Sequence, residues 1–526
     1  MVSGLYFRLL VLLAVTRLSG AASPCLPRQF AESTVCVCNS TYCDKIEPTG
    51  NLSPNQAVLY QSTKSGVRLQ KSVLNWAVAS RSKKAAEIET LTAKINPSTQ
   101  YQEIFGFGGA FTDAAGINIK SLSQAAQQNL MEAYFSSDGI QYTVGRIPMA
   151  SCDFSTHEYS YDDVAGDLNL THFQLAKEDF EYKIPLIQLA QKLSGNKVRL
   201  FGSPWSPPAW MKTNKLMHSN GTIIGYPGGP YYKSWANYFV KFLEEYRKQN
   251  VSLWGLTAQN EPLSGFVPGY AWQTCGFTDA MQRDFIARDL GPALAKTGFQ
   301  HVKLMIMDDQ RMELPRWAQT VLDSSHSAAQ YVSGVAVHYY WDQLFPASVL
   351  TKTHELFPNT FILATEACTG EGSGLGTGPS LGSWYRGEVY AHDIIQDLNH
   401  WVVGWTDWNL ALDLTGGPNW AKNVVDAPII INKTADEFYK QPMFYALAHF
   451  SKFLPPGSKR IELQLNPEHF WLSGSAFRKP NGDRVMVLLN RGFDDYSLSI
   501  SESGRTGNLI VQVKAHSIST ILWAKN

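Results

Sequence analysis

The sequence predicts an α/β fold in which a (β/α)8 TIM barrel is joined to an all-β sandwich domain and to a small disulfide-bonded β module. Three observations support this prediction. Apolar, β-rich runs alternate with helix-like segments through the middle of the chain, strand-like runs without helices fill its end, and four cysteines cluster near its start. Alternating strands and helices are typical of a parallel sheet, whereas strands separated only by turns indicate a sandwich.

The first residues have the pattern of a secretory leader. Arg8 precedes the apolar stretch 9–15, and small residues occupy 19–23. This order predicts a signal peptide over 1–22 rather than a membrane span. No later run of the sequence is long and apolar enough to cross a bilayer. We therefore expect the mature protein in the lumen of the secretory pathway or outside the cell.

The clustered cysteines agree with an oxidising compartment. Cys25, Cys36, Cys38 and Cys43 predict two disulfides that staple a small, loop-rich module. Cys36 and Cys38 are too close in sequence to bond easily, which leaves Cys25–Cys36 with Cys38–Cys43, or the crossed pairing. A zinc knuckle is the competing interpretation, and the missing CxxC pattern disfavours it. The cysteines expected as buried free thiols are Cys152, Cys275 and Cys368.

Asn-x-Ser/Thr sequons along the chain fit a secreted glycoprotein. The sequon at Asn51 is disfavoured because Pro54 follows it. N-glycosylation is predicted at Asn39, Asn169, Asn220, Asn250 and Asn432.

The middle of the chain supplies the eight strands of the predicted barrel. The β-rich runs lie at Ile104–Ala110, Tyr142–Met149, Val198–Ser203, Leu253–Thr257, Val302–Met307, Val332–Val337, Phe361–Thr365 and Val402–Trp405. The helix-like segments between them include Leu122–Phe135, Tyr232–Arg247, Met281–Leu294 and Tyr390–Leu398. Eight alternations favour a closed barrel over an open sheet, and barrels build their active sites at the carboxyl ends of the strands.

The end of the chain consists of strand-like runs joined by turns. These runs lie at Ile461–Leu465, Phe470–Phe477, Arg484–Leu489, Tyr496–Ile500 and Leu509–Val513. The sequence 480–483 (PNGD) is a hairpin turn between two of them. The early strands near Ala57–Tyr60 and Glu87–Ile95 have no partners of their own, so we expect them to complete the same sandwich.

These assignments divide the chain into discontinuous domains. The disulfide-bonded module takes 23–53 and 409–440, a segment that includes a Gly/Pro/Asn-rich stretch. The sandwich takes 54–101 and 456–526, and the catalytic barrel takes 102–408 and 441–455.

Composition excludes some classes of function. The chain has 526 residues, of which 44% are apolar, so it can bury a large core and exceeds a lone barrel. Its 45 acidic and 45 basic residues cancel, so nucleic acid is not an expected partner. Neither a metal nor a cofactor is predicted, because HExxH and phosphate-loop patterns are missing. The glycine-rich stretch 370–382 is instead expected to form a rim of the active site.

Two glutamates end strand-like runs of the predicted barrel. Glu261 follows the fourth run and Glu366 follows the seventh, so both belong at the same mouth of the barrel. One glutamate at a strand end is usually a solvated cap, but a pair at this spacing favours catalysis. Glycoside hydrolysis uses two carboxyl groups, one that protonates the leaving oxygen and one that attacks the sugar or activates water.

Six motifs in fixed order resemble one enzyme family. They are 106–113 (GFGGAFTD), 146–154 (RIPMASCDF), 203–208 (SPWSPP), 260–262 (NEP), 366–368 (EAC) and 404–409 (GWTDWN). From Cys25 onward the chain resembles the glucosylceramidases of glycoside hydrolase family 30. The resemblance implies a retaining β-glucosidase that acts on glucosylceramide in the lysosome, at an anionic membrane surface. It also implies a saposin-type activator and a lysosomal sorting receptor as partners.

The resemblance implies a role for each matching residue. Glu261 would be the general acid/base, Glu366 the nucleophile and Asn260 the partner of the sugar 2-hydroxyl. Tyr340 would orient the nucleophile, and Arg146 would support the carboxylates, although a purely structural role for Arg146 is equally favoured. The residues expected to hold the glucose are Asp153, Trp205 and Trp408, with His338, Asp113 and Asn423 completing the shell.

The chain departs from the family pattern on the lipid side. The loop after Glu366 is almost free of aromatics, and Tyr339 stands where tryptophan is usual. Exposed aromatics at Trp341, Phe345, Phe266 and Trp272 are candidates to replace them. The rival functions are a family 30 glycosidase acting on a xyloside or fucoside, and an inactive glycolipid-binding protein. The second is disfavoured because a binder needs neither glutamate.

Overall fold

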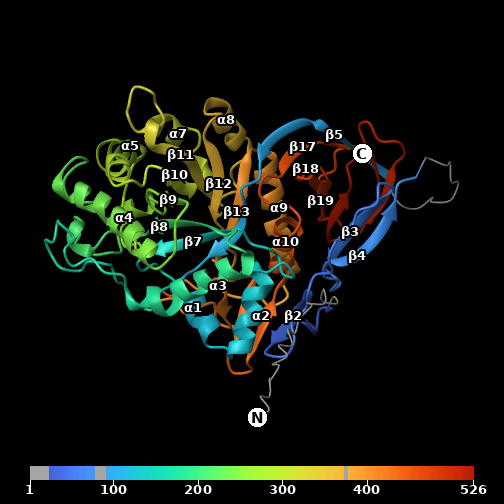
Figure 1. Cartoon of the computed structure of the whole chain (residues 1–526), viewed down its shortest axis with the longest axis horizontal. Helices are drawn as coiled ribbons and strands as arrows, with labels where there is room; N and C mark the ends of the chain where they lie inside the picture. Colours follow the sequence, from blue (N-terminus) through green and yellow to red (C-terminus); the bar gives the residue numbers. More distant parts are fainter. Residues whose placement is uncertain (1–22, 78–89, 372–376, 526) are drawn as a thin grey trace, which may run out of the picture.

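The computed structural model describes residues 23–77, 90–371 and 377–525. The predicted signal peptide, the start of the strand expected at Glu87–Ile95 and the centre of the glycine-rich stretch lie outside the described residues. Figure 1 shows the barrel on one side, the large and mostly antiparallel sheet on the other and the small module near the N-terminus.

Within the described residues, eight parallel strands close into a barrel. They are β6 (Gly106–Ala110), β7 (Val144–Met149), β8 (Arg199–Pro204), β9 (Gly255–Thr257), β10 (Lys303–Gln310), β11 (Val332–His338), β12 (Phe361–Glu366) and β13 (Val402–Asn409). Each of the eight predicted runs forms one strand, so the barrel prediction is confirmed. The strands β10 and β13 continue past their predicted ends into polar residues.

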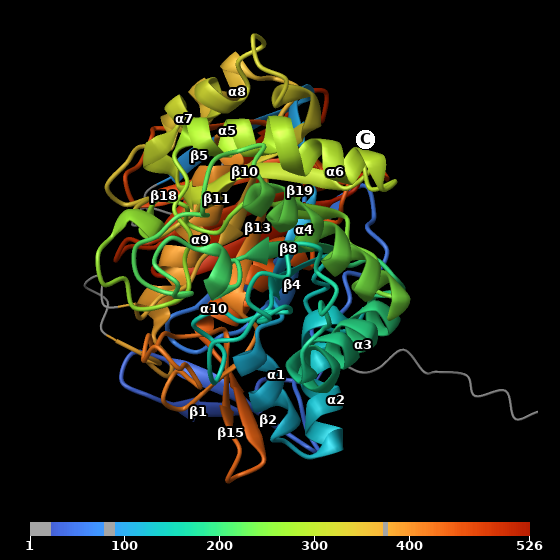
Figure 2. The same cartoon turned by 90° about the vertical axis from the view of Figure 1, so that its left-hand side faces the viewer.

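Helices surround this barrel, and Figure 2 shows α3 to α7 in front of its strands. The helices are α1 (Asp113–Lys120), α2 (Gln124–Phe135), α3 (Ile184–Ser194), α4 (Pro230–Lys248), α5 (Asp279–Phe285), α6 (Gly291–Lys296), α7 (Arg316–Val321), α8 (Ser348–Leu356), α9 (Trp384–Asn399) and α10 (Pro442–Ser451). The predicted helix Met281–Leu294 is divided by a π-helical turn, Ile286–Leu290. Pro292 follows this turn and has no N–H for the regular ladder, which explains the division.

A second, larger sheet forms the sandwich. Its order is β21-β20-β5-β17-β18-β19-β22-β3-β4. The strands are β3 (Gln56–Thr63), β4 (Gln70–Asn75), β5 (Thr90–Glu103), β17 (Lys459–Asn466), β18 (Leu472–Arg478), β19 (Arg484–Asn490), β20 (Tyr496–Glu502), β21 (Leu509–Val513) and β22 (Ser517–Trp523). Ala77 and Asn508 exchange backbone hydrogen bonds of 3.0 and 2.9 Å, which brings the two ends of the sheet together.

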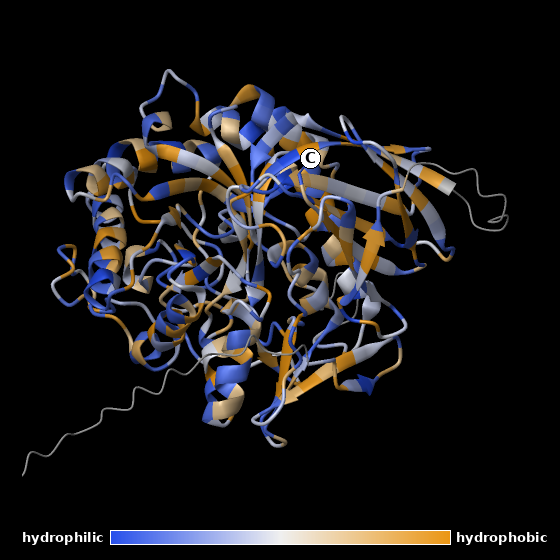
Figure 3. Cartoon of the chain, turned by 45° about the vertical axis from the view of Figure 1, so that its right-hand side comes forward, coloured by the Kyte–Doolittle hydropathy of each residue, from blue (hydrophilic) through white to orange (hydrophobic). Residues whose placement is uncertain are grey.

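The early strands β3 and β5 therefore join the late strands, as the sequence predicts. Two strands were not predicted. β22 is a continuous buried run, and β4 is a largely exposed edge strand without clear alternation. Figure 3 shows apolar residues concentrated in the strands of the sheets, while polar residues are prominent on the outer helices.

The small module is a sheet in the order β1-β2-β16-β15-β14. Its strands are β1 (Pro27–Gln29), β2 (Thr34–Asn39), β14 (Leu412–Asp413), β15 (Ile429–Asn432) and β16 (Glu437–Lys440). The disulfides are Cys25–Cys36 and Cys38–Cys43, which is the first of the two pairings left open by the sequence. The other cysteines are buried thiols, as predicted. The domain boundaries at single-residue detail stay a prediction.

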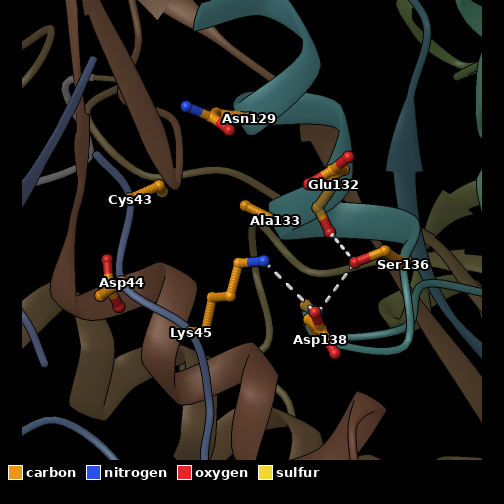
Figure 4. A pocket seen from close by; sticks show the side chains of 9 residues that line it. Cys43, Asp44, Lys45, Asn129, Glu132, Ala133, Ser136 and Asp138 are labelled. Carbon is orange, nitrogen blue, oxygen red and sulfur yellow. Dashed lines mark hydrogen bonds and ion pairs between the residues drawn. The ribbon is translucent and has the colours of Figure 1, made fainter. Parts of the chain in front are cut away.

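The module docks beside α2 of the barrel. Figure 4 shows this contact, where Lys45 Nζ lies 3.3 Å from Asp138 Oδ2 and Ser136 Oγ donates to the carbonyl of Glu132 at 2.7 Å. The pocket between them is small, about 20 Å³, and the ion pair is exposed, so the ion pair contributes little to stability. Among the described residues, no helix is both long and apolar enough to cross a membrane.

A cluster of buried carboxyl groups is formed by Asp393 and Asp397 of α9 together with Asp342. Arg311 contacts Asp342 at 2.9 Å and Asp397 at 3.4 Å, and Asp393 accepts from Trp405 Nε1 at 2.8 Å. Burial raises the pKa of Asp342, Asp393 and Asp397, and their mutual repulsion adds to the rise for Asp342 and Asp397. The single Arg311 guanidinium opposes this effect without cancelling it.

Because of this cluster, we expect the folded chain to be more stable towards unfolding at acid pH than at neutral pH. The folded chain keeps protons that the unfolded chain releases above its ordinary aspartate pKa near 4, so stability is full below that pH and falls as pH rises. Asp397→Asn removes one of the three charges. We expect it to raise the melting temperature at pH 7.5 by about 2 to 4 °C and to leave it nearly unchanged at pH 4.5.

The matched control is Asp138→Asn, since Asp138 is an exposed carboxylate paired with Lys45. It should leave the pH dependence of the melting temperature unaltered. An equal effect of Asp397→Asn at both pH values would show that the cluster does not titrate in this range.

Candidate active site

A cavity of about 470 Å³ opens among the carboxyl ends of the barrel strands. Glu261 and Glu366 both line it, as expected for residues that follow the fourth and seventh strands. Other lining residues are Asp153, Trp205, Asn260, Leu263, Ser264, Val267, Tyr270, Trp272, Asp309, Gln310, Met312, Tyr340, Trp341, Cys368, Glu371, Trp408, Asn423 and Val425. The cavity thus combines carboxyl groups, aromatic faces and apolar side chains.

Glu366 is the last residue of β12, and it is held on both oxygens. Tyr340 OH donates to Oε1 at 2.6 Å, and the Arg146 guanidinium pairs with Oε2. Burial raises the pKa of Glu366, while the positive charges of Arg146 and His338 oppose that rise. The carboxylate is therefore fixed in position but kept desolvated, which suits a nucleophile.

Glu261 lies just after β9 with a left-handed backbone, φ 41°. Such a conformation is strained for a residue with a side chain, and strain of this kind is concentrated at functional sites. His338 Nδ1 lies 3.1 Å from Oε1, and Tyr270 OH donates to Oε2 at 3.2 Å. One oxygen of Glu261 and one of Glu366 lie within 4.8 Å of each other. This closeness fits a retaining pair, because inverting pairs are separated by about 6.5–9.5 Å.

A buried network beneath the cavity connects the two glutamates. Arg146 donates to Asp308 Oδ2 at 2.9 Å and to Asn260 Oδ1 at 2.8 Å. His338 Nε2 lies 3.0 Å from Asp308 Oδ1, while its Nδ1 faces Glu261. Burial lowers the pKa of an imidazole, but the surrounding carboxylates outweigh burial and raise the pKa of His338 to about 10. The raised pKa favours the imidazolium form of His338, which can donate from both nitrogens, to Glu261 and to Asp308.

Asp308 holds this network together through Arg146 and His338, and the sequence reasoning did not single it out. Burial favours its neutral form, but Arg146 and His338 hold the pKa of Asp308 well below its usual range. Met307 and Asp308 both have positive φ, and the pairing of β10 with β11 shifts register there. This bulge re-aims the strand end, so that Asp308 lies beneath the cavity and Asp309 lines it.

Most of the residues predicted to hold the glucose line this one cavity. Trp205 and Trp408 stack at 5.0 Å between ring centroids with an interplanar angle of 17°. Asp153 Oδ2 accepts from Asn423 Nδ2 at 2.9 Å and from Asn419 Nδ2 at 3.3 Å. Burial raises the pKa of Asp153 to about 7, although these two amides favour its anion. The stacked rings offer apolar faces, and the Asp153 group offers polar partners, as a sugar requires.

Three predicted residues do not line the cavity. Arg146 and His338 lie in the buried network. Asp113, at the start of α1, is held by Ser155 Oγ at 2.6 Å and Tyr159 OH at 2.8 Å, with Lys183 Nζ at 3.4 Å. Its place in the glucose shell, which the resemblance implies, stays a prediction.

The predicted glycosylation sites differ in exposure. Asn169, Asn220 and Asn250 are exposed, while Asn39 and Asn432 are half-buried. Asn432 Nδ2 also donates to Tyr439 OH at 3.0 Å. Use of these sites stays a prediction.

Comparison with known proteins agrees with this geometry. Residues 104–454 match the glycosyl hydrolase family 30 TIM-barrel domain, and residues 457–521 match the family 30 beta sandwich domain. The chain is 47% identical over 506 residues to lysosomal acid glucosylceramidase of Mus musculus, with 96% of each chain covered. It is also 47% identical over 494 residues to putative glucosylceramidase 4 of Caenorhabditis elegans, with 93% of each chain covered.

A solved structure shares the fold. SrfJ from Salmonella typhimurium has a TM-score of 0.80 and 27% identity, with 90% of this chain and 100% of that chain covered. The chain therefore belongs to the glucosylceramidases of glycosyl hydrolase family 30, and it is a retaining glycoside hydrolase.

Proposed function

We propose that this chain hydrolyses the β-glucosidic bond of glucosylceramide to glucose and ceramide by double displacement in the lysosome. The observation that supports this most strongly is the close pair of Glu261 and Glu366, set in a cavity with stacked tryptophans at the sugar side. The relatives of matching length that are named glucosylceramidases support the choice of substrate.

In the first step, Glu366 attacks the anomeric carbon while Glu261 gives its proton to the glycosidic oxygen. The bond from carbon to the leaving oxygen breaks, ceramide departs as an alcohol, and a glucosyl ester forms on Glu366. Arg146 and Tyr340 orient the nucleophile through its two oxygens. In the second step, the Glu261 carboxylate takes a proton from water, which attacks the same carbon and releases glucose with its β configuration.

The sugar is held by polar and aromatic groups. Trp205 and Trp408 would contact the C–H face of glucose, while Asp153 and Asn423 would bind hydroxyl groups. Asn260 Oδ1 already accepts from Arg146, which leaves its amide nitrogen as the donor to the 2-hydroxyl. This contact gains strength in the oxocarbenium-like transition state.

The lipid side is apolar and exposed. Phe266, Val267, Met312, Trp341 and Leu344 are large apolar side chains with 38% to 76% exposure, on loops that border the catalytic glutamates. Exposed apolar groups of this kind mark sites of membrane or protein contact. They support peripheral binding to an anionic membrane, with a saposin-type activator and a lysosomal sorting receptor as further partners.

Turnover of glucosylceramide in phosphatidylserine-containing vesicles at pH 5, with and without saposin, tests the proposal. We expect glucose release that saposin increases, and none above background from Glu366→Gln. Matched β-xylosides and β-fucosides should be cleaved more slowly. Faster cleavage of either sugar than of the glucoside would favour a different β-glycoside as substrate.

A further inference from the structure

Gln310, at the end of β10, has a side-chain amide that is hydrogen-bonded at its nitrogen but not at its oxygen. Its Nε2 donates to Glu261 Oε1 at 3.3 Å. Its Oε1 is buried and has no hydrogen-bond partner among the described residues. Gln310 also lines the catalytic cavity. A buried acceptor without a donor is costly, so its presence in a binding cavity points to a donor on the ligand.

Asp309, the preceding residue, lines the same cavity and is 5% exposed. Its oxygens accept only backbone N–H groups in the described chain, from Gln310 at 2.8 Å and Leu263 at 3.2 Å. Burial and the charge of Glu261 raise the pKa of Asp309 to about 7. In an acidic compartment this carboxyl group therefore carries a proton that it can donate to a ligand.

The position of this pair identifies the part of the substrate that it meets. Gln310 contacts Glu261, the group that protonates the leaving oxygen, and not the nucleophile Glu366. A residue bonded to the general acid borders the leaving group rather than the glucose. The adjoining wall is apolar, because Leu263 follows Glu261 and Met312 follows Gln310 on the same loops. The leaving group that fits is a lipid with one polar linkage near its alcohol.

We propose that Gln310 and Asp309 form a subsite for the secondary amide of the lipid leaving group, with Gln310 Oε1 accepting its N–H and the Asp309 carboxyl group donating to its carbonyl. An amide supplies one donor and one acceptor, which matches the pair. The inference rests on the proposed function and deepens it, because it assigns the feature by which an N-acylated lipid glucoside is distinguished from other alkyl glucosides.

The test uses three β-glucosides with the same two hydrocarbon chains, in which the second chain is joined by an amide, an ester or an ether. The ester lacks the N–H, and the ether lacks both the N–H and the carbonyl. For the full chain at pH 5, we expect kcat/KM to fall about tenfold from amide to ester, the size of one lost hydrogen bond to a neutral partner. It should fall further from ester to ether.

Gln310→Met should abolish the amide-over-ester preference, and Asp309→Ala should abolish the ester-over-ether preference. Tyr270→Phe is the matched control, since Tyr270 also donates to Glu261 but lacks the unpartnered acceptor. It should slow all three glucosides by one common factor. Thermal unfolding and active-site titration with an activated 2-fluoroglucoside correct each rate for folded, competent enzyme.

Two results would overturn the subsite. One is equal slowing of amide and ester by Gln310→Met, which would mean that Gln310 acts only through Glu261. The other is wild-type enzyme that cleaves all three glucosides equally well, which would remove the subsite while leaving the β-glucosidase activity in place. If the enzyme cleaved none of the three glucosides and did not cleave a simple alkyl glucoside either, the result would instead contradict the proposed function.

Discussion

Replacing Glu366 with glycine is expected to lower kcat/KM for every β-glucoside by about 10⁴-fold or more, a loss typical of a removed nucleophile. No glucosyl ester can form, and the space left by the side chain admits a small anion. Added azide should therefore attack an activated β-glucoside directly and give α-glucosyl azide, which proton NMR identifies by its anomeric coupling.

Tyr340→Phe is the control for this variant, because it removes one hydrogen bond to the same carboxylate. A loss of about 10- to 100-fold, without any glucosyl azide, is expected for a bond to a charged group. If azide instead gave the β anomer with Glu366→Gly, the roles of the two glutamates would be exchanged.

Replacing Glu261 with glutamine is expected to slow glucosylceramide cleavage by about 10²- to 10⁴-fold, the usual contribution of a general acid. A dinitrophenyl leaving group needs little protonation, so its release in the first turnover should be nearly normal. Stopped-flow measurement of the initial burst of dinitrophenol separates formation of the glucosyl ester from its hydrolysis. The hydrolysis should be slow because no base activates water.

His338→Asn serves as a comparison, since His338 contacts Glu261 but does not line the cavity. It should slow both classes of leaving group by a similar factor. A burst from Glu261→Gln that is slowed as severely as glucosylceramide cleavage would show that Glu261 is not the acid.

The barrel, and the place of the two glutamates at one mouth of it, could be predicted from sequence because each depends on local pattern. Buried parallel strands are continuous apolar runs; Glu366 ends one of them, β12, and Glu261 lies in the loop that follows another, β9. The pairing of the four early cysteines could not be decided, since it depends on how the chain turns between Cys25 and Cys36. β4 was missed because an exposed edge strand lacks the alternation that marks a half-buried one.

Asp308, Asp309 and Gln310 were missed at the site for one physical reason. The fifth strand was expected to end at Met307, where the apolar run stops, whereas β10 continues through a bulge to Gln310. The polar sequence Asp308-Asp309-Gln310 at a strand end was itself the signal. For Asp113 the motif match gave its identity but not its partners, Ser155, Tyr159 and Lys183, which lie later in the chain; its place in the glucose shell stays a prediction.

The most direct test of the account is to trap the covalent intermediate. An activated 2-fluoro-β-glucoside should react with the enzyme at pH 5 and then hydrolyse very slowly, because fluorine disfavours the oxocarbenium-like transition state of both steps and a good leaving group restores only the first. Peptide mass spectrometry of the inactivated enzyme should find one fluoroglucosyl group on Glu366. A label on Glu261, or steady turnover of glucosylceramide by enzyme that never acquires a label, would contradict the account.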